Sequence, residues 1–452
     1  MKHVTWFIVG SILLILSGNF FSGCINQNQT PSPLSYTIVE IATQIMYDFN
    51  MSNFSDAFEF FNTSLLDVIN EQQISDIWHS IISTYGTFLG IESNRTTSEA
   101  GYMVVYLTCN YSNLGFLDTR FVFNTEKLVD GFQFVQTDLS YLYTPPDYAD
   151  PTTFTEVNVT IGEEPWQLPG TLTLPTTGAE SYPAVVLVQG SGPNDRDETI
   201  GPNKPFKDLA WGLATRGIVV LRYEKRTKEY ASVIATMLDN FTVEDETITD
   251  AIAGVTFLSS YPGINSSHIF LLGHSLGGYL APRIASQDSA IAGLIMLAAP
   301  TRPIEDLIIE QVYYLAELDG NITAEEQANI DSVQQQVELI RTLNISVGEI
   351  VLGASYSYWA DLASYNPVST ALNISIPMLI LQGKRDYQVS YTEDFSVWQH
   401  TFANATNVEL KAYDELNHLF MPGTGKPTNT EYNIPNHVAL QVIEDIAQWI
   451  KS

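Results

Sequence analysis

A serine flanked by glycines is the residue in this sequence with the clearest capacity for chemistry. The run Gly273-His-Ser-Leu-Gly277 places Ser275 at the centre of a G-x-S-x-G pentapeptide. The apolar run 268–272 before it reads as a buried strand, and residues 278–285 after it can start a helix. In such a strand–turn–helix the glycines allow close approach, and the serine hydroxyl is exposed on a strained turn. The pattern predicts a serine nucleophile; the structural alternative is a glycine-rich helix start that Ser275 caps.

Residues 153–452, which contain this pentapeptide, resemble the α/β-hydrolase family. That family orders its catalytic residues along the chain as serine, acid and histidine. The resemblance implies that Asp386 is the acid, because it follows the apolar run 377–381 at a predicted strand end. It implies that His418 is the base, because the loop that carries it follows the strand-like run 407–412.

Other acidic residues and histidines compete for the same roles. Asp361 falls in an inserted segment, and Asp394 falls on the helix after the acid, where we expect a solvated face. His274 lies inside the pentapeptide, next to the nucleophile, where its ring should point away from a partner role. Structural roles are expected for the histidines on predicted strands and helices, which are His268, His400 and His437.

The chemistry of acyl transfer assigns a role to each implied residue. A serine hydroxyl is a poor nucleophile, so His418 must take its proton while Asp386 orients the imidazole and stabilises the imidazolium. The tetrahedral oxyanion needs hydrogen-bond donors that are already in place. We expect the N–H of Leu276, directly after the nucleophile, and the N–H of Ser191, in the loop after the apolar run 184–188.

Four segments resemble the two-domain, EstD-type bacterial esterases more specifically: residues 190–198, 221–227, 382–387 and 416–420. This resemblance implies hydrolysis of carboxylic esters with short acyl chains. Gln189 stands where histidine is common in these enzymes. Gly190 and Gly192 could instead suggest a dinucleotide-binding turn, but no third glycine follows at the required spacing. Ion pairing within loops, rather than substrate contact, is expected for Asp195, Arg196, Asp197, Arg222 and Arg226.

The elements that must position these residues follow an α/β pattern. Residues 153–161 and 168–174 show the alternation of apolar and polar residues that is typical of strands. Short, continuously apolar runs then alternate with amphipathic segments, at 184–188, 217–221, 268–272, 291–298 and 377–381. Strands that are buried on both faces require a parallel sheet wrapped by helices. The pattern predicts an α/β-hydrolase domain over residues 152–452.

An insertion at residues 301–367, before the acid strand, predicts a helical cap over the serine. Thr323 and Glu326 form a capping box. One apolar stripe at helical spacing follows, made of Ile330, Val333, Val337 and Ile340. Five aromatic residues could line the acyl pocket or pack inside the cap: Tyr313, Tyr314, Tyr356, Tyr358 and Trp359.

A smaller α+β domain is predicted at residues 35–145, before a proline-rich boundary near 143–151. Apolar residues recur at helical spacing over 34–82, and strand-like runs follow at 102–108, 117–123 and 131–143. The element order, with Trp78 and Gly86, resembles the cone-shaped, NTF2-like domains that precede some secreted hydrolases. No catalytic constellation is visible in it.

The N-terminus predicts export. Lys2 and His3 precede an apolar run, and Phe21-Ser-Gly-Cys24 resembles a lipoprotein box in which Cys24 receives the lipid. The alternative is an uncleaved membrane anchor. Both place the rest of the chain on the extracellular face of the cell membrane, on a polar linker at 25–34.

Recurrent N-x-S/T sequons support export, and they predict a glycoprotein; the alternative is an Asn-rich surface without glycans. They begin at Asn28, Asn50, Asn53, Asn62, Asn94, Asn110, Asn158, Asn240, Asn265, Asn321, Asn344, Asn373 and Asn404. If Cys24 carries lipid, Cys109 is the remaining thiol, and no intrachain disulfide can form. We expect Cys109 to be buried and structural.

Composition excludes several other classes of protein. With 51 acidic and 20 basic residues, the net charge is −31, which should repel nucleic acid. The 7 histidines and 2 cysteines form no recognised metal-binding spacing, so neither a metal nor a cofactor is expected. Three functions stay open: an esterase acting on small-molecule esters, a serine aminopeptidase in which Glu305, Glu310 or Glu317 binds the substrate amine, and a non-catalytic surface-binding protein.

Overall fold

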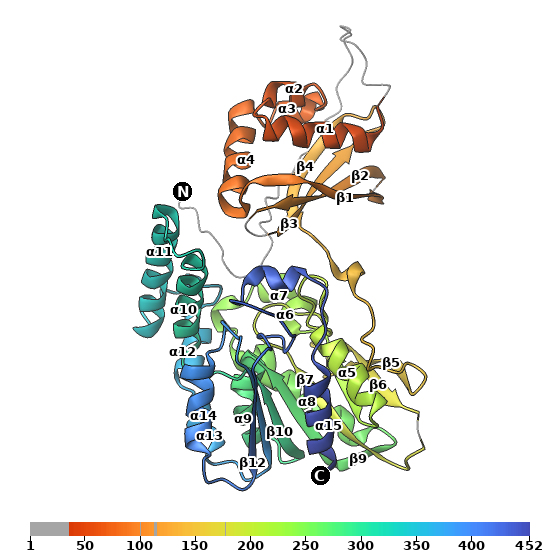
Figure 1. Ribbon diagram of the computed structural model, residues 1–452, viewed down its shortest axis with the longest axis vertical. Helices are drawn as coiled ribbons and strands as arrows, with labels where there is room; N and C mark the ends of the chain where they lie inside the picture. Colours follow the sequence, from red (N-terminus) through yellow and green to blue (C-terminus); the bar gives the residue numbers. More distant parts are fainter. Residues whose placement is uncertain (1–35, 100, 113–114, 177) are drawn as a thin grey trace. The chain divides into compact units, whose positions relative to one another are not determined.

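The computed structural model describes residues 36–99, 101–112, 115–176 and 178–452, which form two compact units (Figure 1). The first unit ends at Leu139, and the second runs from Ser140 to Ser452. The predicted signal, lipid-attachment and linker residues, 1–34, lie outside the described residues. Within the described ranges, no helix combines the length and the apolar character needed to cross a bilayer.

The first unit is an α+β domain in which helices precede an antiparallel sheet. Its helices are α1 (Ile38–Asn50), α2 (Phe54–Phe58), α3 (Thr63–Leu66) and α4 (Glu71–Tyr85). Its strands β1 (Phe88–Glu99), β2 (Tyr102–Tyr111), β3 (Gly115–Phe123) and β4 (Val129–Gln136) are neighbours in chain order. Helix and sheet residues share one core, in which Phe49 contacts both Trp78 and Phe132. The element order predicted from the sequence is confirmed.

Two strands of this unit differ from the expectation. The predicted strand 131–143 ends at Gln136, which pairs with Leu117 near the start of β3. Strand β1 was not foreseen as an element. Only Phe88 among its residues is buried, so its polar sequence carries little of the apolar signal on which strand prediction depends.

The second unit contains an eight-stranded mixed sheet in the order β12-β11-β10-β9-β7-β8-β6-β5. The strands are β5 (Phe154–Ile161), β6 (Leu168–Pro175), β7 (Tyr182–Val188), β8 (Val219–Tyr223), β9 (Ile264–His274), β10 (Ile291–Leu297), β11 (Met378–Gly383) and β12 (Val408–Tyr413). In this order, the neighbouring strands from β12 to β8 pair in parallel. Strand β6 pairs antiparallel with both β8 and β5. Every strand expected in this domain is present.

Side chains of the central strands alternate between two hydrophobic cores. In β7, Val186 and Val188 belong to the core on one face, and Val185 and Leu187 belong to the core on the other. The first core also contains residues of α8 (Thr249–Ser260) and α9 (Leu276–Gln287). The second contains residues of α5 (Pro205–Thr215) and α15 (Leu440–Lys451). Burial on both faces explains the continuously apolar runs.

The predicted cap is helical. Its helices are α10 (Ile304–Ala316), α11 (Ala324–Arg341) and α12 (Tyr356–Ala363), and the short helix α13 (Pro367–Ala371) follows it. Both bonds of the capping box are formed, since Glu326 N–H donates to Thr323 Oγ1 and Thr323 N–H donates to Glu326 Oε2. The apolar stripe of α11 is buried as expected: Ile330, Val333, Val337 and Ile340.

Shorter helical segments complete the second unit. They are the 3₁₀ or π segments η2 (Ser140–Leu142), η3 (Leu238–Asn240), η4 (Glu244–Ile248), η5 (Tyr391–Phe395) and η6 (Asn429–Asn433), with the α-helices α6 (Arg226–Glu229), α7 (Ala231–Ile234) and α14 (Ser396–Thr401). The predicted boundary segment, residues 143–151, is held to the loop before α15: Tyr148 Oη donates to the carbonyl of Val438 at 2.8 Å.

Candidate active site

Ser275 lies at the tight turn from β9 into α9. Its backbone has φ 52° and ψ −116°, a conformation that side chains adopt only when the surroundings enforce it. The flanking glycines are required for steric reasons. A Cβ on Gly277 would lie 2.2 Å from the carbonyl oxygen of Val188, and a Cβ on Gly273 would lie 2.2 Å from that of Gly277. The close approach expected from the sequence is therefore confirmed.

Asp386 and His418 lie together. His418 Nδ1 is 2.8 Å from Asp386 Oδ2, and both side chains are buried. The carboxylate is held by further donors: the N–H groups of Gln388 and Val389 at Oδ1, and Nε2 of Gln382 at Oδ2. A proton on Nδ1 that points at the carboxylate leaves Nε2 of His418 as the basic nitrogen, which is the tautomer a general base needs.

The loop that carries His418 packs against the turn that carries Ser275. The rings of His274 and His418 have centroids 4.7 Å apart, and His274 Nε2–H donates to the backbone carbonyl of His418 at 2.9 Å. Ser275 follows the end of β9, Asp386 follows β11, and His418 follows β12. Because the carboxyl ends of parallel strands meet at one edge of the sheet, the fold places all three predicted residues there.

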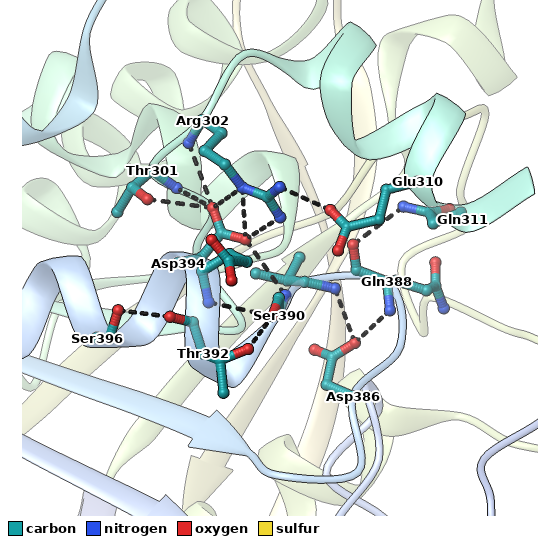
Figure 2. Close-up of polar contacts among 12 residues, drawn as sticks. Thr301, Arg302, Glu310, Gln311, Asp386, Gln388, Ser390, Thr392, Asp394 and Ser396 are labelled. Carbon is teal, nitrogen blue, oxygen red and sulfur yellow. Dashed lines mark hydrogen bonds and ion pairs between the residues drawn. The ribbon is translucent and has the colours of Figure 1, made fainter. Parts of the chain in front are cut away.

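The rival acid Asp394 is not on a solvated face, which corrects the expectation. It is fully buried on η5 and accepts hydrogen bonds from Arg302 Nη2 at 2.7 Å and from the Thr301 N–H at 2.9 Å. Figure 2 shows Arg302 reaching across to Asp394, with Asp386 on the same chain segment. Asp394 ties the start of the cap to the acid loop. The other rival, Asp361, pairs with Arg283 at 2.9 Å.

The two predicted oxyanion donors are free of competing partners. Neither the N–H of Leu276 nor that of Ser191 donates to any other group in the described part of the chain. Leu276 is the first residue of α9, where backbone N–H groups have no intrahelical acceptor. The Ser191 loop lies against the nucleophile, since a Cβ on Gly190 would be 3.2 Å from Ser275 Cβ.

Glu198, which no sequence pattern singles out, is a buried residue beside the nucleophile. Its Oε1 accepts the N–H of Gly190 at 2.6 Å, and its Oε2 lies 3.0 Å from His274 Nδ1, in an ion pair not aligned as a hydrogen bond. Burial alone would lower the pKa of His274, but the charge of Glu198 and the bond to His418 outweigh it and raise the pKa. No motif marks Glu198; its sole sequence signal was its place in the segment 190–198.

The charged residues of the neighbouring loops form ion pairs within the fold. Arg222 bridges Asp197 and Glu156, Arg226 binds Asp250, and Arg196 binds Glu224. Desolvation raises the pKa of Asp250 to about 6 in spite of Arg226. Asp195 accepts the N–H groups of Asp197 and Thr199. These contacts agree with the structural roles expected for the loop charges.

The cap aromatics separate into packing residues and residues near the acid loop. Trp359 is buried and donates to the carbonyl of Val351 within the cap, whereas Tyr358 Oη donates to Glu246 on η4 and joins the cap to the rest of the domain. Tyr314 stacks on Tyr387, the residue after Asp386, with ring centroids 5.1 Å apart. The side chains of Tyr313 and Tyr356 are exposed.

The cap carboxylates differ in how free they are to bind a cation. Glu310 is paired with Arg302 at 2.6 Å. Glu305 is buried, and desolvation raises its pKa, whereas Glu317 is exposed. Across the residues that the structure describes, no three His, Cys, Asp or Glu side chains are grouped to hold a metal.

Known proteins resemble this chain in both of its units. The family described as "Serine aminopeptidase, S33" matches residues 204–422, and a protein family of unknown function (DUF3887) matches residues 42–132. Esterase EstD of Thermotoga maritima is 38% identical over 398 residues, which cover 88% of this chain and 92% of that protein.

Solved structures show a more distant likeness. The acylaminoacyl peptidase of Pyrococcus horikoshii has a TM-score of 0.45 at 13% identity, over 80% of this chain and 49% of the peptidase. Est1E from Butyrivibrio proteoclasticus has a TM-score of 0.41 at 16% identity, over 65% of this chain and 97% of Est1E. Neither likeness is close enough to indicate function.

Proposed function

The chain belongs to the α/β-hydrolase family, in the same two-domain group as Esterase EstD, and on that premise we propose that it hydrolyses carboxylic esters of short-chain acids through an acyl-enzyme intermediate. The proposal rests on the site geometry as well as on the family. Its main support is the buried contact of His418 Nδ1 with Asp386 Oδ2 at 2.8 Å, at the strand edge that carries Ser275.

In the proposed reaction, Ser275 Oγ attacks the ester carbonyl as His418 Nε2 takes the hydroxyl proton. Asp386 stabilises the imidazolium that forms. His418 then gives the proton to the leaving alcohol, which breaks the C–O bond and leaves the acyl group on Ser275. A water molecule, deprotonated by His418, attacks the acyl-enzyme and releases the acid.

The oxyanion of each tetrahedral intermediate is proposed to accept hydrogen bonds from the N–H groups of Leu276 and Ser191. Both donors are held before substrate arrives, one by a helix start and the other by a fixed loop. Donors that need no reorganisation stabilise developing charge best. Loss of one such donor typically slows catalysis by about 10²- to 10³-fold.

The proposal is tested with p-nitrophenyl esters of increasing acyl length. We expect hydrolysis that is fastest for short chains and lost in Ser275→Ala, whose folding is checked by thermal unfolding. A fluorophosphonate probe should label Ser275 in the wild-type protein. An unlabelled, correctly folded wild-type protein would instead support the non-catalytic surface-binding alternative.

A serine aminopeptidase is the second candidate, because the family description that matches residues 204–422 names that activity. An aminopeptidase needs an anion for the substrate amine. Glu310 is paired with Arg302, and Glu305 is buried, so two of the three predicted carboxylates are poor candidates. Comparing aminoacyl p-nitroanilides with p-nitrophenyl acetate separates the two activities. Faster cleavage of the anilide would favour the peptidase.

Export to the extracellular face of the membrane, with Cys24 lipidated, is part of the proposal. The exposed side chains of most sequons in the described residues are compatible with glycans: Asn50, Asn53, Asn94, Asn158, Asn240, Asn321, Asn344, Asn373 and Asn404. The test is metabolic labelling with a radioactive fatty acid, which Cys24→Ser should abolish, together with the intact mass before and after deglycosylation.

A further inference from the structure

Lys225 is a buried cation to which the proposed mechanism gives no role. It follows β8, and only 1% of its surface is exposed. Its Nζ donates to the backbone carbonyl of Gly190 at 2.6 Å and pairs with Glu246 Oε1 at 2.8 Å. A buried ammonium costs several kcal/mol of desolvation unless it is paired and hydrogen bonded. Both of these contacts are present.

The carbonyl that Lys225 binds belongs to the same peptide group as the N–H of Ser191. That peptide is trans, because the single cis bond of the described residues is Glu164–Pro165. In a trans peptide the C=O and the N–H point in opposite directions. Holding the Gly190 oxygen at Lys225 therefore turns the Ser191 N–H to the opposite side of the loop. A cation at the carbonyl also polarises the peptide and makes its N–H a stronger donor.

Other contacts keep this peptide group from rotating. Asn194 Nδ2 also donates to the Gly190 carbonyl at 3.2 Å, and Glu198 holds the N–H of Gly190, which belongs to the preceding peptide group. The carboxylate that pairs with Lys225 is itself held, since Tyr358 Oη of α12 donates to Glu246 Oε2 at 2.5 Å. Contacts therefore run without a break from a cap helix to the oxyanion loop.

From these contacts we infer that Lys225 is a positioning residue for the oxyanion hole: its ammonium orients and polarises the Gly190–Ser191 peptide so that the Ser191 N–H stabilises the tetrahedral oxyanion. Lys225 touches neither substrate nor reacting atoms in this role. The inference rests on the proposed ester hydrolysis. It adds that the Lys225 ammonium makes the Ser191 N–H a stronger hydrogen-bond donor.

The test compares an oxygen ester with the matching thionoester, in which sulfur replaces the carbonyl oxygen. Sulfur is a weak hydrogen-bond acceptor, so the thionoester gains little from the oxyanion donors. In Lys225→Met, kcat for the oxygen ester should fall by about 10- to 100-fold, less than for loss of a whole donor, with KM nearly unchanged. The rate for the thionoester should fall much less. The oxo-to-thiono ratio, which is kcat for the oxygen ester divided by kcat for the thionoester, should therefore drop. In Tyr358→Phe the ratio should drop only slightly.

Because Lys225→Met leaves Glu246 as an unpaired buried charge, the variant could fail to fold. The double variant Lys225→Met/Glu246→Gln removes both charges and should fold, and it should show the same drop in the ratio. The matched control is Arg226→Met/Asp250→Asn, which removes a neighbouring buried ion pair without touching Gly190. Its oxo-to-thiono ratio should equal that of the wild type.

Two outcomes would overturn the inference, and they are distinguishable from failure of the proposed function. If the folded double variant keeps the wild-type ratio, or if both substrates slow equally, Lys225 does not act through the oxyanion hole. If the wild-type protein hydrolyses no ester and no fluorophosphonate labels Ser275, the proposed function fails, and the role of Lys225 fails with it.

Discussion

His274 binds the backbone of His418 through a hydrogen bond of 2.9 Å, although the two residues are 144 positions apart in the sequence. Its other ring nitrogen faces Glu198. Both nitrogens of His274 therefore face acceptors, which the doubly protonated imidazolium serves best. The residue before the nucleophile thus fastens the loop of the predicted base and the loop of a predicted oxyanion donor.

The first prediction concerns the pH dependence of stability. The folded-state pKa of His274 is raised above the usual 6.5, mainly by the charge of Glu198 acting against desolvation. A raised pKa means that the fold favours the protonated form. This stabilisation is complete below about pH 6.5 and is lost as the pH rises through the folded-state pKa.

Urea unfolding between pH 6 and pH 9 measures this loss. In Glu198→Gln, which keeps an acceptor for the Gly190 N–H but removes the charge, the decline over this range should be smaller than in the wild type. His268→Gln is the control, since His268 is exposed. Equal declines in the wild type and in Glu198→Gln would contradict the assignment.

The second prediction separates two buried carboxylates on one segment. Asp386→Asn should keep the fold and lower kcat by about 10⁴-fold, because the amide favours the wrong tautomer of His418. Asp394→Asn should destabilise the protein by about 1.5–3 kcal/mol, because it weakens the charge-assisted hydrogen bonds that the buried Asp394 carboxylate accepts from Arg302. Thermal unfolding and ester hydrolysis are measured for both. A stable but inactive Asp394→Asn would transfer the role of the acid to Asp394.

The third prediction concerns the turn beneath the nucleophile. In Gly277→Ala the new methyl group would lie 2.2 Å from the carbonyl oxygen of Val188 and 2.8 Å from that of Gln189. The turn must therefore open. We expect no soluble, folded hydrolase domain. Gly131→Ala is the matched change on strand β4, where a Cβ meets no atom within 4 Å, and it should change the melting temperature little. Soluble, active Gly277→Ala would show that the turn tolerates a side chain.

The fourth prediction concerns the thiol of Cys109 in the first unit. The side chain is fully buried in the helix–sheet core, and desolvation raises its pKa to about 12. The thiolate is the reactive form, so iodoacetamide at pH 8 should leave Cys109 unmodified in the native protein and modify it after unfolding in guanidinium. Mass spectrometry of the peptide that contains Cys109 measures the two states. Rapid modification under native conditions would indicate local opening of β2.

The sequence alone determined the features that depend on local pattern. Continuously apolar runs identified the strands of the hydrolase sheet, because a strand that is buried on both faces needs apolar residues at consecutive positions. The glycines around Ser275 identified its turn, because the close approach of the backbone there excludes a Cβ. The order of serine, acid and histidine then implied Asp386 and His418. The edge strand β1 is mostly polar and therefore lacks the apolar pattern from which a strand is predicted.

Only the tertiary structure decided which distant polar groups meet. Asp394 reads as a surface residue in the sequence, yet it is buried and bound by Arg302, which lies 92 positions away. Glu198 and Lys225 carry no motif, and their importance comes from binding the backbone N–H and the backbone carbonyl of the same residue, Gly190. Local sterics and apolar periodicity act between neighbours in sequence. Buried charges are instead selected by the partners that the completed fold brings within hydrogen-bonding distance.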